Sequence, residues 1–395
     1  LQLVKSEQGE LGFRVLVGGG LGRTPIIGQE LRAFLPWQHV LTYLEAIVRV
    51  YNEFGRRDNL YKARIKILVQ AIGIAEFRRQ VEAEWQLNKD GLSTLSEAEL
   101  ARVSAAFAPH AYDLLPQLDA AFEATQRDDR AFANWVRRNV KAHKVDGYAA
   151  VWLSLKRPGQ APGDISADQL DVVAALAERY SFGELRFSHA QNLVLADVKQ
   201  SDLFALWQEA KAAGLATPNI GLLTDIICCP GADYCTLANA RSITLAQAVA
   251  ERFDDYDYLH DIGDIDLNIS GCVNACGHHH VGHIGILGVD KSGEEWYQIT
   301  IGGNQGSPAA IGKIIGRSFS FAQVPEVIAR LLQVYVRERF DGERFIDTLR
   351  RIGHEPFKEF VYATPVAEEE ALLVPDYAAL QVGVPHELPY YSPRF

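Results

Sequence analysis

The chain has 395 residues and a mass of 43.8 kDa, which exceeds one ordinary hydrophobic core and predicts two or more lobes. Its 48% apolar and 23% charged residues are typical of a soluble globular protein, and its net charge of −11 argues against a nucleic-acid binder. No apolar run is long enough to span a membrane and no secretory signal opens the chain. We therefore predict a cytoplasmic protein with no membrane partner.

Two further features of the composition bear on where the chain comes from and works. It contains no Met and begins at Leu1, which predicts a processed or partial copy of a longer protein. It has five cysteines, an odd number, and a chain of this size needs no disulfide bonds. These cysteines indicate a reducing compartment and thiolates kept free for a metal.

The first elements along the chain are a strand, a glycine-rich turn and a helix. Residues 12–25, GFRVLVGGGLGRTP, predict a strand that runs into a tight turn, because the dinucleotide spacing of glycines is only partly met. Apolar residues then recur at helical spacing between Pro36 and Gly55. For residues 55–69 we predict one amphipathic helix whose basic side carries Lys62 and Lys66, either solvated or facing a polyanion.

Residues 75–140 are predicted to be helical and charge-rich, with a capping box at Ser96 to Glu99, and to have no chemistry of their own. From Gly147 the pattern changes to strand, helix, paired strands and helix, with Ser166 and Gln169 predicted to cap the first helix, which indicates a half-ferredoxin-like α+β unit ending near residue 215. A helix at 244–253, a strand at 266–269 and a hairpin around Lys291 to Gly293 follow. Pro325 and Gly353 mark further helix ends, and the tail beyond Tyr362 is predicted to wrap the surface or to be partly mobile.

Four of the five cysteines form two close pairs. They occur as C-x5-C in CPGADYC (Cys229 and Cys235) and as C-x3-C in GCVNACG (Cys272 and Cys276). Such pairs predict a metal or iron–sulfur site, and a five-residue gap is wider than structural zinc knuckles prefer. The remaining Cys228 is predicted to be a small buried residue.

These motifs resemble those of the sulfite and nitrite reductase hemoproteins. In that family C-x5-C and C-x3-C bind a four-iron four-sulfur cluster, and the last cysteine is shared with the iron of a siroheme. ELRFSHAQNLVLADV is similar to the family's second-repeat signature, and GFRVLVGGGLGRTP to the close of its first, so the resemblance runs from about Gly12 to Tyr362. The chain is most similar to the bacterial assimilatory sulfite reductase hemoproteins (beta subunits) without their N-terminal part.

The resemblance implies a pseudo-repeated α+β fold with mixed α+β catalytic lobes. It divides the chain into the end of a first catalytic lobe (1–85), a helical connection (86–146), a ferredoxin-like half-domain (147–215), a siroheme and iron–sulfur lobe (216–362) and an extended tail (363–395).

The resemblance also implies roles for particular residues. Cys229, Cys235 and Cys272 would be cluster ligands, and Cys276 would join the cluster to the siroheme. The carboxylates of siroheme need cations and polar donors, for which the candidates are Arg186, Gln191, Thr224 and Asn274. Arg23 and Asn274 are the candidates for contact with the small oxyanion substrate. The His278, His279, His280 and His283 group is expected to pack beside the cofactor, because adjacent side chains cannot all face one ion.

The implied activity is the six-electron reduction of sulfite to sulfide in sulfur assimilation, by an oxidoreductase that receives electrons from a flavoprotein reductase or a ferredoxin. Reduction of nitrite to ammonia is the alternative within the family. An alternative of another class is a non-catalytic cysteine-metal protein, since arginines of the family's upstream half have no counterpart in this chain.

Overall fold

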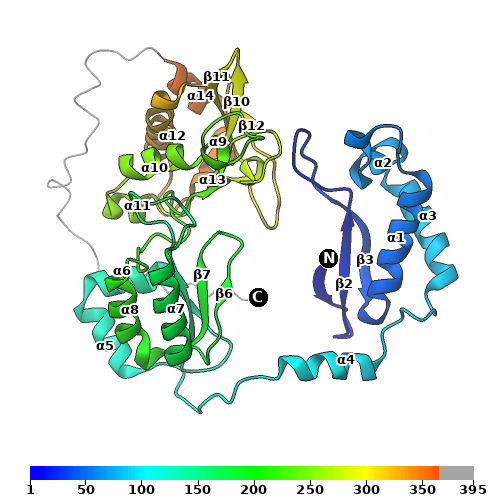
Figure 1. Cartoon of the computed structure of the whole chain (residues 1–395), viewed down its shortest axis with the longest axis horizontal. Helices are drawn as coiled ribbons and strands as arrows, with labels where there is room; N and C mark the ends of the chain where they lie inside the picture. Colours follow the sequence, from blue (N-terminus) through cyan, green and yellow to red (C-terminus); the bar gives the residue numbers. More distant parts are fainter. Residues whose placement is uncertain (364–395) are drawn as a thin grey trace.

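The computed structural model describes residues 1–363, and within them the chain forms three hydrophobic cores, each built on its own sheet (Figure 1). The first core lies within residues 15–85, the second within 132–215 and the third within 222–361. The prediction of several lobes is therefore confirmed. The part of the chain after residue 363, including the acidic tail, lies outside the described residues.

The first lobe is a three-stranded antiparallel sheet in the order β1-β2-β3, covered by helices. Alternate residues of the strands, such as Val15 and Leu35, are buried against the helices, as period-two patterning requires. The elements are β1 (Gln2–Lys5), β2 (Leu11–Val17), β3 (Gln29–Pro36), η1 (Trp37–His39), α1 (Val40–Phe54), η2 (Leu60–Lys62), α2 (Ile65–Ile72) and α3 (Ile74–Asn88).

The half-domain has a four-stranded antiparallel sheet in the order β4-β5-β7-β6, and apolar residues of three helices pack with it in one core. The predicted capping box at the start of its first helix is present, with Ser166 and Gln169 bonded reciprocally. The predicted strand, helix, paired strands and helix are all confirmed. The elements are β4 (Val140–Ala142), β5 (Tyr148–Leu153), α7 (Ala167–Tyr180), β6 (Arg186–Phe187), β7 (Leu193–Lys199), η4 (Gln200–Asp202) and α8 (Leu203–Ala212).

The third lobe has a mixed five-stranded sheet in the order β12-β11-β10-β9-β8. Its β10–β11 hairpin turns at the predicted position, and Gly353 ends a helix with a positive φ of 80°. The elements are β8 (Ile227–Cys228), α9 (Gly231–Tyr234), α10 (Ile243–Arg252), α11 (Tyr256–Ile262), β9 (Leu267–Ser270), η5 (His279–Val281), β10 (Ile284–Lys291), β11 (Glu294–Ile301), β12 (Lys313–Ile314), η6 (Phe321–Gln323), α12 (Val324–Glu338), α13 (Phe345–Ile352) and α14 (Glu355–Tyr362).

A connecting segment joins the first lobe to the half-domain (Figure 1). Its helices are α4 (Glu97–Ser104), η3 (Ala105–Phe107), α5 (Ala120–Asp128) and α6 (Arg130–Asn139). The prediction of a helical connection is only partly right, because residues 108–119 form no helix. In this stretch the Tyr112 hydroxyl donates to Asp197 of β7 at 2.6 Å, so the segment is attached to the half-domain. Ser96 caps α4 by accepting from the Glu99 backbone N–H.

The prediction of one amphipathic helix over residues 55–69 is wrong. Asn59 caps only the short turn η2, and Arg64 has extended backbone angles, so α2 begins at Ile65. Lys62 and Lys66 therefore do not share a helix face. Lys66 Nζ instead donates to the backbone carbonyls of Leu21 and Thr24, at 2.9 Å and 2.8 Å. This ammonium holds the glycine-rich loop between β2 and β3.

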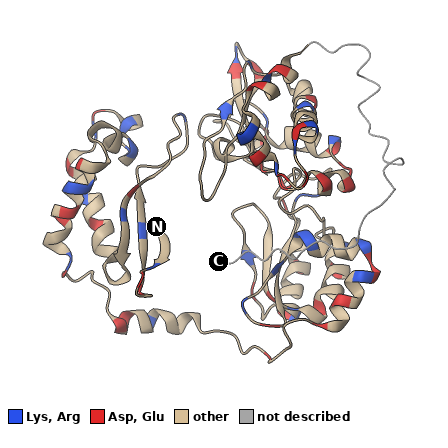
Figure 2. Ribbon diagram, turned by 180° about the vertical axis from the view of Figure 1, so that it is seen from behind, with Lys and Arg blue, Asp and Glu red and all other residues tan. Residues whose placement is uncertain are grey.

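Charge is distributed evenly over the molecule. Figure 2 shows basic and acidic residues interspersed along the helices of all three units. Many of them form ion pairs within one helix, such as Arg79 with Glu76 and Arg102 with Glu99. None of the described helices has the length and apolar character needed to cross a membrane.

Replacing Lys66 by Met should loosen the glycine-rich loop. Hydrogen bonds from a charged donor contribute roughly 1.5–3 kcal/mol each, so amide exchange over residues 18–28 should become faster by at least about tenfold. Hydrogen exchange followed by mass spectrometry measures this directly. Lys62→Met is the matched control, because Lys62 is exposed, and equal effects of the two substitutions would contradict the role of Lys66.

Candidate metal centre

The two cysteine pairs follow two neighbouring parallel strands. β8 pairs in parallel with β9, Cys228 lies opposite Ile269, and the Cys229 N–H donates to the Ile269 carbonyl at 3.2 Å. Adjacent parallel strands end at the same edge of a sheet, so the loops that follow them meet there. Cys229 begins the first loop and Cys272 follows the second strand. The fold therefore brings together the motifs that spacing alone had suggested.

Glycines allow the two loops to approach closely. A Cβ on Gly271 would lie 2.6 Å from the Ala240 carbonyl oxygen and 2.8 Å from Gly231 Cα, which no side chain tolerates. The Gly271 N–H donates to Cys229 Sγ at 3.1 Å. Such a hydrogen bond stabilises the thiolate, which is the form that binds metal.

The Asp of the first motif fixes that loop to the helix behind it. The Asp233 carboxylate accepts from the backbone N–H groups of Ser242 and Ile243, both at 2.9 Å, and from the Thr244 hydroxyl. These are the donors that a helix start leaves unpaired, so Asp233 caps α10. The C-x5-C loop thus has a defined conformation independent of any bound group.

The four thiols suit an iron–sulfur cluster better than one zinc ion. Burial, and then the charges of Cys229, Cys272 and Cys235, raise the pKa of the Cys276 thiol, so the other three cysteines lie near it. Within the described residues, no three of these sulfurs lie within 4.8 Å of one another, whereas Zn–S bonds of about 2.3 Å would put them about 3.8 Å apart. Four thiolates at wider spacing need a larger cationic group between them.

The second loop presents its last cysteine outward. Cys272 is buried and Cys276 is exposed, with Asn274 exposed between them. Ala275 and His278 have positive φ angles of 59° and 56°, which non-glycine residues rarely adopt. Such strain collects at functional sites, where the surrounding structure enforces it. The strained turns direct the Cys276 thiol away from the core.

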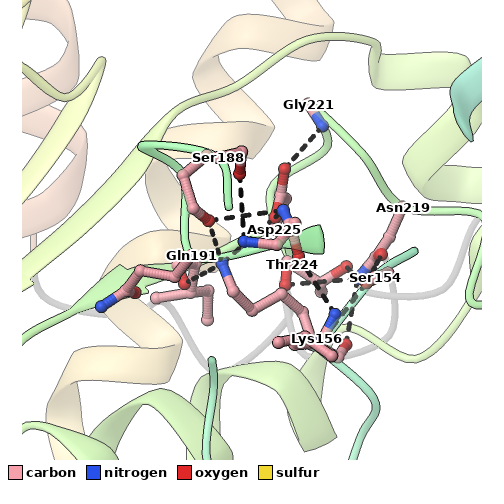
Figure 3. A network of polar contacts seen from close by, with 12 residues as sticks. Ser154, Lys156, Ser188, Gln191, Asn219, Gly221, Thr224 and Asp225 are labelled. Carbon is pink, nitrogen blue, oxygen red and sulfur yellow. Dashed lines mark hydrogen bonds and ion pairs between the residues drawn. The ribbon is translucent and has the colours of Figure 1, made fainter. Parts of the chain in front are cut away.

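A buried polar network lies directly before the first cysteine loop (Figure 3). Lys156, which is 2% exposed, donates from Nζ to the carbonyls of Ala190 and Ile226 at 2.8 Å and 2.9 Å, and its ammonium lies 3.2 Å from Asp225 Oδ1. Asn192 Nδ2 donates to the same carboxylate oxygen at 2.9 Å. The network joins the half-domain to the segment that leads into Cys229.

Two sequence-predicted residues belong to this region. Gln191 donates from Nε2 to the Cys228 carbonyl at 2.8 Å and accepts from the Cys228 N–H at 3.1 Å, so it binds the peptide next to a predicted ligand. The buried Thr224 hydroxyl accepts from Asn219 at 3.3 Å. Cys228 itself is buried as predicted, and burial raises the pKa of its thiol to about 12.

Arg186 lies elsewhere in the described structure. Its exposed guanidinium pairs with Glu184 at 3.0 Å and lies 3.9 Å from Asp197 Oδ2. No hydrogen bond or ion pair of the described residues joins it to the cysteine loops. Its role as a siroheme ligand stays a prediction.

The glycine-rich loop of the first lobe reaches the second cysteine loop. His280 Nε2 lies 2.8 Å from the Gly22 carbonyl oxygen, and Gly22 lies beside the Val273 carbonyl. Arg23, the next residue, is exposed. The histidines turn to different partners: His279 is buried, whereas His283 Nδ1 accepts from the Asp266 N–H at 3.1 Å. The His279 and His280 rings lie 3.9 Å apart between centroids, and the packing of this group beside the cofactor stays a prediction.

Sequence reasoning missed Lys156, Asn192 and Asp225. The sequence does contain a signal for Lys156, which ends the largely apolar run YAAVWLSLK. A lysine buried with such a run is rare unless it is paired, so the run could have indicated a buried ion pair. Its partner could not be read from the sequence, since Asp225 lies 69 residues further on.

Comparisons with known proteins agree with this site. The family description "Nitrite and sulphite reductase 4Fe-4S domain" matches residues 1–89 and 222–369, and "Nitrite/Sulfite reductase ferredoxin-like half domain" matches residues 146–213. The four-thiol centre and the half-domain thus define an iron–sulfur protein of a known class. The chain belongs to the nitrite and sulfite reductase family, whose members bind siroheme and a four-iron four-sulfur cluster. The predicted family, fold and cofactors are confirmed.

Individual relatives are distant and longer. The chain is 27% identical over 361 residues to "Sulfite reductase [ferredoxin] 2" of Mycolicibacterium paratuberculosis, covering 88% of this chain and 57% of that protein. It is 26% identical over 339 residues to the chloroplastic "Ferredoxin--nitrite reductase" of Arabidopsis thaliana, covering 83% of this chain and 51% of that protein. The solved structure of Mycobacterium tuberculosis NirA protein matches with a TM-score of 0.67 and 25% identity. The match covers 90% of this chain and 60% of the NirA chain. The chain spans little more than half the length of these relatives.

Replacing Lys156 by Met should destabilise the junction between the half-domain and the third lobe. The substitution leaves Asp225 buried without its cation, which costs roughly 3–5 kcal/mol. Urea unfolding at matched cofactor content measures the loss, and Lys144→Met serves as the control because Lys144 is exposed. The double variant with Asp225→Asn should recover part of the loss, and a Lys156→Met protein as stable as the control would contradict the ion-pair account.

Proposed function

We propose that this chain supplies the siroheme and cluster-binding part of a reductase that converts sulfite to sulfide by six electrons. The observation that carries the proposal is the convergence of four thiols at the ends of one parallel strand pair, with Cys276 exposed. A relative 27% identical to this chain over 361 residues is named a sulfite reductase. The acceptor of the electrons is a small oxyanion.

The cysteines have unequal roles in this proposal. Cys229, Cys235 and Cys272 bind the cluster alone, and Cys276 also binds the siroheme iron. When bound, the two groups supply single electrons to one iron at which substrate is reduced. The protein contributes the Gly271 N–H on Cys229 Sγ, which tunes the thiolate, and the strained turn that presents Cys276.

The remaining candidates act around the cofactor. Gln191 is a positioning residue, because its two hydrogen bonds fix the Cys228 peptide before the first ligand. Asn274 is exposed between two cysteines and offers an amide to a cofactor carboxylate or to the substrate. Thr224 supports the same segment through Asn219.

Arg23 is proposed to contact the anion. The support is its position directly after Gly22, whose carbonyl lies 2.8 Å from His280 and which neighbours Val273 of the second cysteine loop. A guanidinium beside an oxyanion stabilises the charge that substrate carries into the reaction.

The electron donor is proposed to be a ferredoxin, with a flavoprotein reductase as the alternative. The relatives named above carry ferredoxin in their names. Residues 56–64 offer an exposed group of basic side chains, although Arg56 is already paired with Asp58. Lys66 is bonded to the glycine-rich loop and is therefore a poor docking residue.

Reduction of nitrite to ammonia is the second candidate function. The Arabidopsis relative is nearly as similar to this chain as the sulfite reductase relative, and it is named a nitrite reductase. Nitrite is therefore the second candidate substrate. A non-catalytic cysteine-metal protein is the third candidate, and the absorption spectrum of the purified protein separates it from the other two. The absence of siroheme bands from well-expressed protein would favour that third candidate.

Replacing Cys276 by Ser should abolish coupling between cluster and haem and reduce turnover to background. Siroheme absorbance, iron content and turnover are measured together in the purified protein. Cys228→Ala is the matched control, because it removes the neighbouring thiol that binds no metal in this proposal, and it should keep iron and activity. Full turnover of the Cys276→Ser protein would refute the proposed role of Cys276.

Replacing Arg23 by Ala should raise the KM for the anion by about tenfold or more, because a charged hydrogen bond of roughly 1.5–3 kcal/mol is lost. Cofactor content should stay unchanged. Sulfite and nitrite are assayed side by side, and the anion with the higher kcat/KM identifies the substrate. Arg14→Ala is the control, since Arg14 pairs with Glu30 on the far strands of the same lobe. An unchanged KM for both anions would exclude Arg23.

A further inference from the structure

A second group of ligand-type side chains lies in the half-domain, apart from the cysteines. His110, Glu184 and Asp197 each offer one ligand atom, and these atoms lie within 4.8 Å of one another. His110 Nε2 lies 3.1 Å from Glu184 Oε1. The three residues come from the connecting segment, the turn before β6 and the strand β7. The proposed reductase chemistry does not use this group.

Asp197 is the buried member of the group. Its side chain is 3% exposed, and Oδ1 accepts from the Tyr112 hydroxyl at 2.6 Å. Oδ2 is buried and has no hydrogen-bond partner among the described residues. Buried carboxylate oxygens nearly always have a hydrogen bond, so an oxygen without one, in a residue grouped with His110 and Glu184, points to a cation at this place.

A histidine beside Asp197 fixes the orientation of the carboxylate. The Val145 N–H donates to His143 Nδ1 at 3.0 Å, so Nδ1 is an acceptor and the proton of the neutral ring lies on Nε2. That Nε2 lies 3.2 Å from Asp197 Oδ1. Because the Tyr112 hydroxyl and His143 Nε2 both lie at Oδ1, Oδ2 is the oxygen left to bind an ion.

The imidazole ligand is also held in place. The His110 ring stacks on Phe182 with 4.6 Å between centroids and 8° between planes. Phe182 has a positive φ of 50°, an uncommon conformation that places its ring under the histidine. Pre-orientation of this kind lowers the cost of ordering a ligand set.

A mobile cation stands beside the group. Arg186 is 60% exposed at its side chain, and its NH2 atom lies 3.0 Å from Glu184 Oε2 and 3.9 Å from Asp197 Oδ2. The second distance is too long for a hydrogen bond, so Arg186 compensates the charge of Asp197 only in part. An exposed guanidinium can leave without a large desolvation cost.

We propose that His110, Glu184 and Asp197 form a binding site for a divalent metal ion, Zn²⁺ or Mn²⁺, with Arg186 as the competing cation. One imidazole and two carboxylates form a mixed nitrogen and oxygen ligand set, which suits these ions and leaves positions for water. The ion joins the connecting segment to the half-domain sheet. Its role is structural, and it is separate from the iron–sulfur centre.

The test measures metal binding to the purified chain with its cluster loaded, so that the four thiols are occupied. Mn²⁺ is titrated and its free ion is counted by electron paramagnetic resonance, and Zn²⁺ is titrated by calorimetry. The variants are His110→Gln, Glu184→Gln and Arg186→Gln. Glu178→Gln is the matched control, since it removes an exposed carboxylate of the same half-domain.

The wild-type protein and the control should bind one equivalent of at least one of the two ions. His110→Gln and Glu184→Gln should weaken that binding by at least about 10–100-fold, the loss that follows even when an outer-shell partner of a metal ligand is removed. Arg186→Gln should tighten it, because the competing cation is gone. Limited proteolysis should show the ion protecting residues 108–119.

The proposal is overturned if neither ion binds, or if binding is the same in both ligand variants as in the control. In that case the group is an ion-pair network completed by Arg186. Glu184 is 44% exposed, so its Gln variant should fold even where the His110 variant does not, and it decides the question alone. The outcome does not depend on whether the protein reduces sulfite, nitrite or neither.

Discussion

The parallel pairing of β8 with β9 is the constraint on which the site depends. It places two short loops at one sheet edge and thereby turns cysteines that are distant in sequence into neighbours. The close approach of the loops needs glycine at 231 and 271, since a Cβ at either position would meet backbone of the other loop or of the helix start behind it. Packing of the lobe's core behind the strands then fixes the sheet, so the metal centre is a product of ordinary β-sheet geometry.

Much of this could be predicted from the sequence, and the reasons for the failures are physical. The cysteine spacing, the capping box at Ser166 and the strand pattern of the half-domain are local signals, and the structure has them where they were expected. The prediction of one helix over residues 55–69 failed because one capping residue and one extended residue interrupt the helical pattern. The Lys156–Asp225 pair could not be predicted, because only the tertiary structure brings its two residues together.

The candidate site residues also divide into those with a local sequence signal and those whose partners are set only by the fold. The four cysteines could be chosen from chain position, because thiolate chemistry and spacing are specific. Arg186 could be chosen only as a charged residue near a strand, and its partners Glu184 and Asp197 are set by the fold. His110 lies in a segment interpreted as a plain helical connection, so nothing in its neighbours' pattern indicated that it would face two carboxylates.

The two hydrogen bonds between Gln191 and the Cys228 peptide have a thermodynamic consequence. They belong to the half-domain on one side and to the cluster-binding lobe on the other, as do the bonds of Lys156. The conformation of the first ligand loop is therefore an equilibrium property of both units together. Loss of order in the half-domain lowers metal affinity at a distance, and a bound cluster stabilises the half-domain by the same free energy, since linkage is reciprocal.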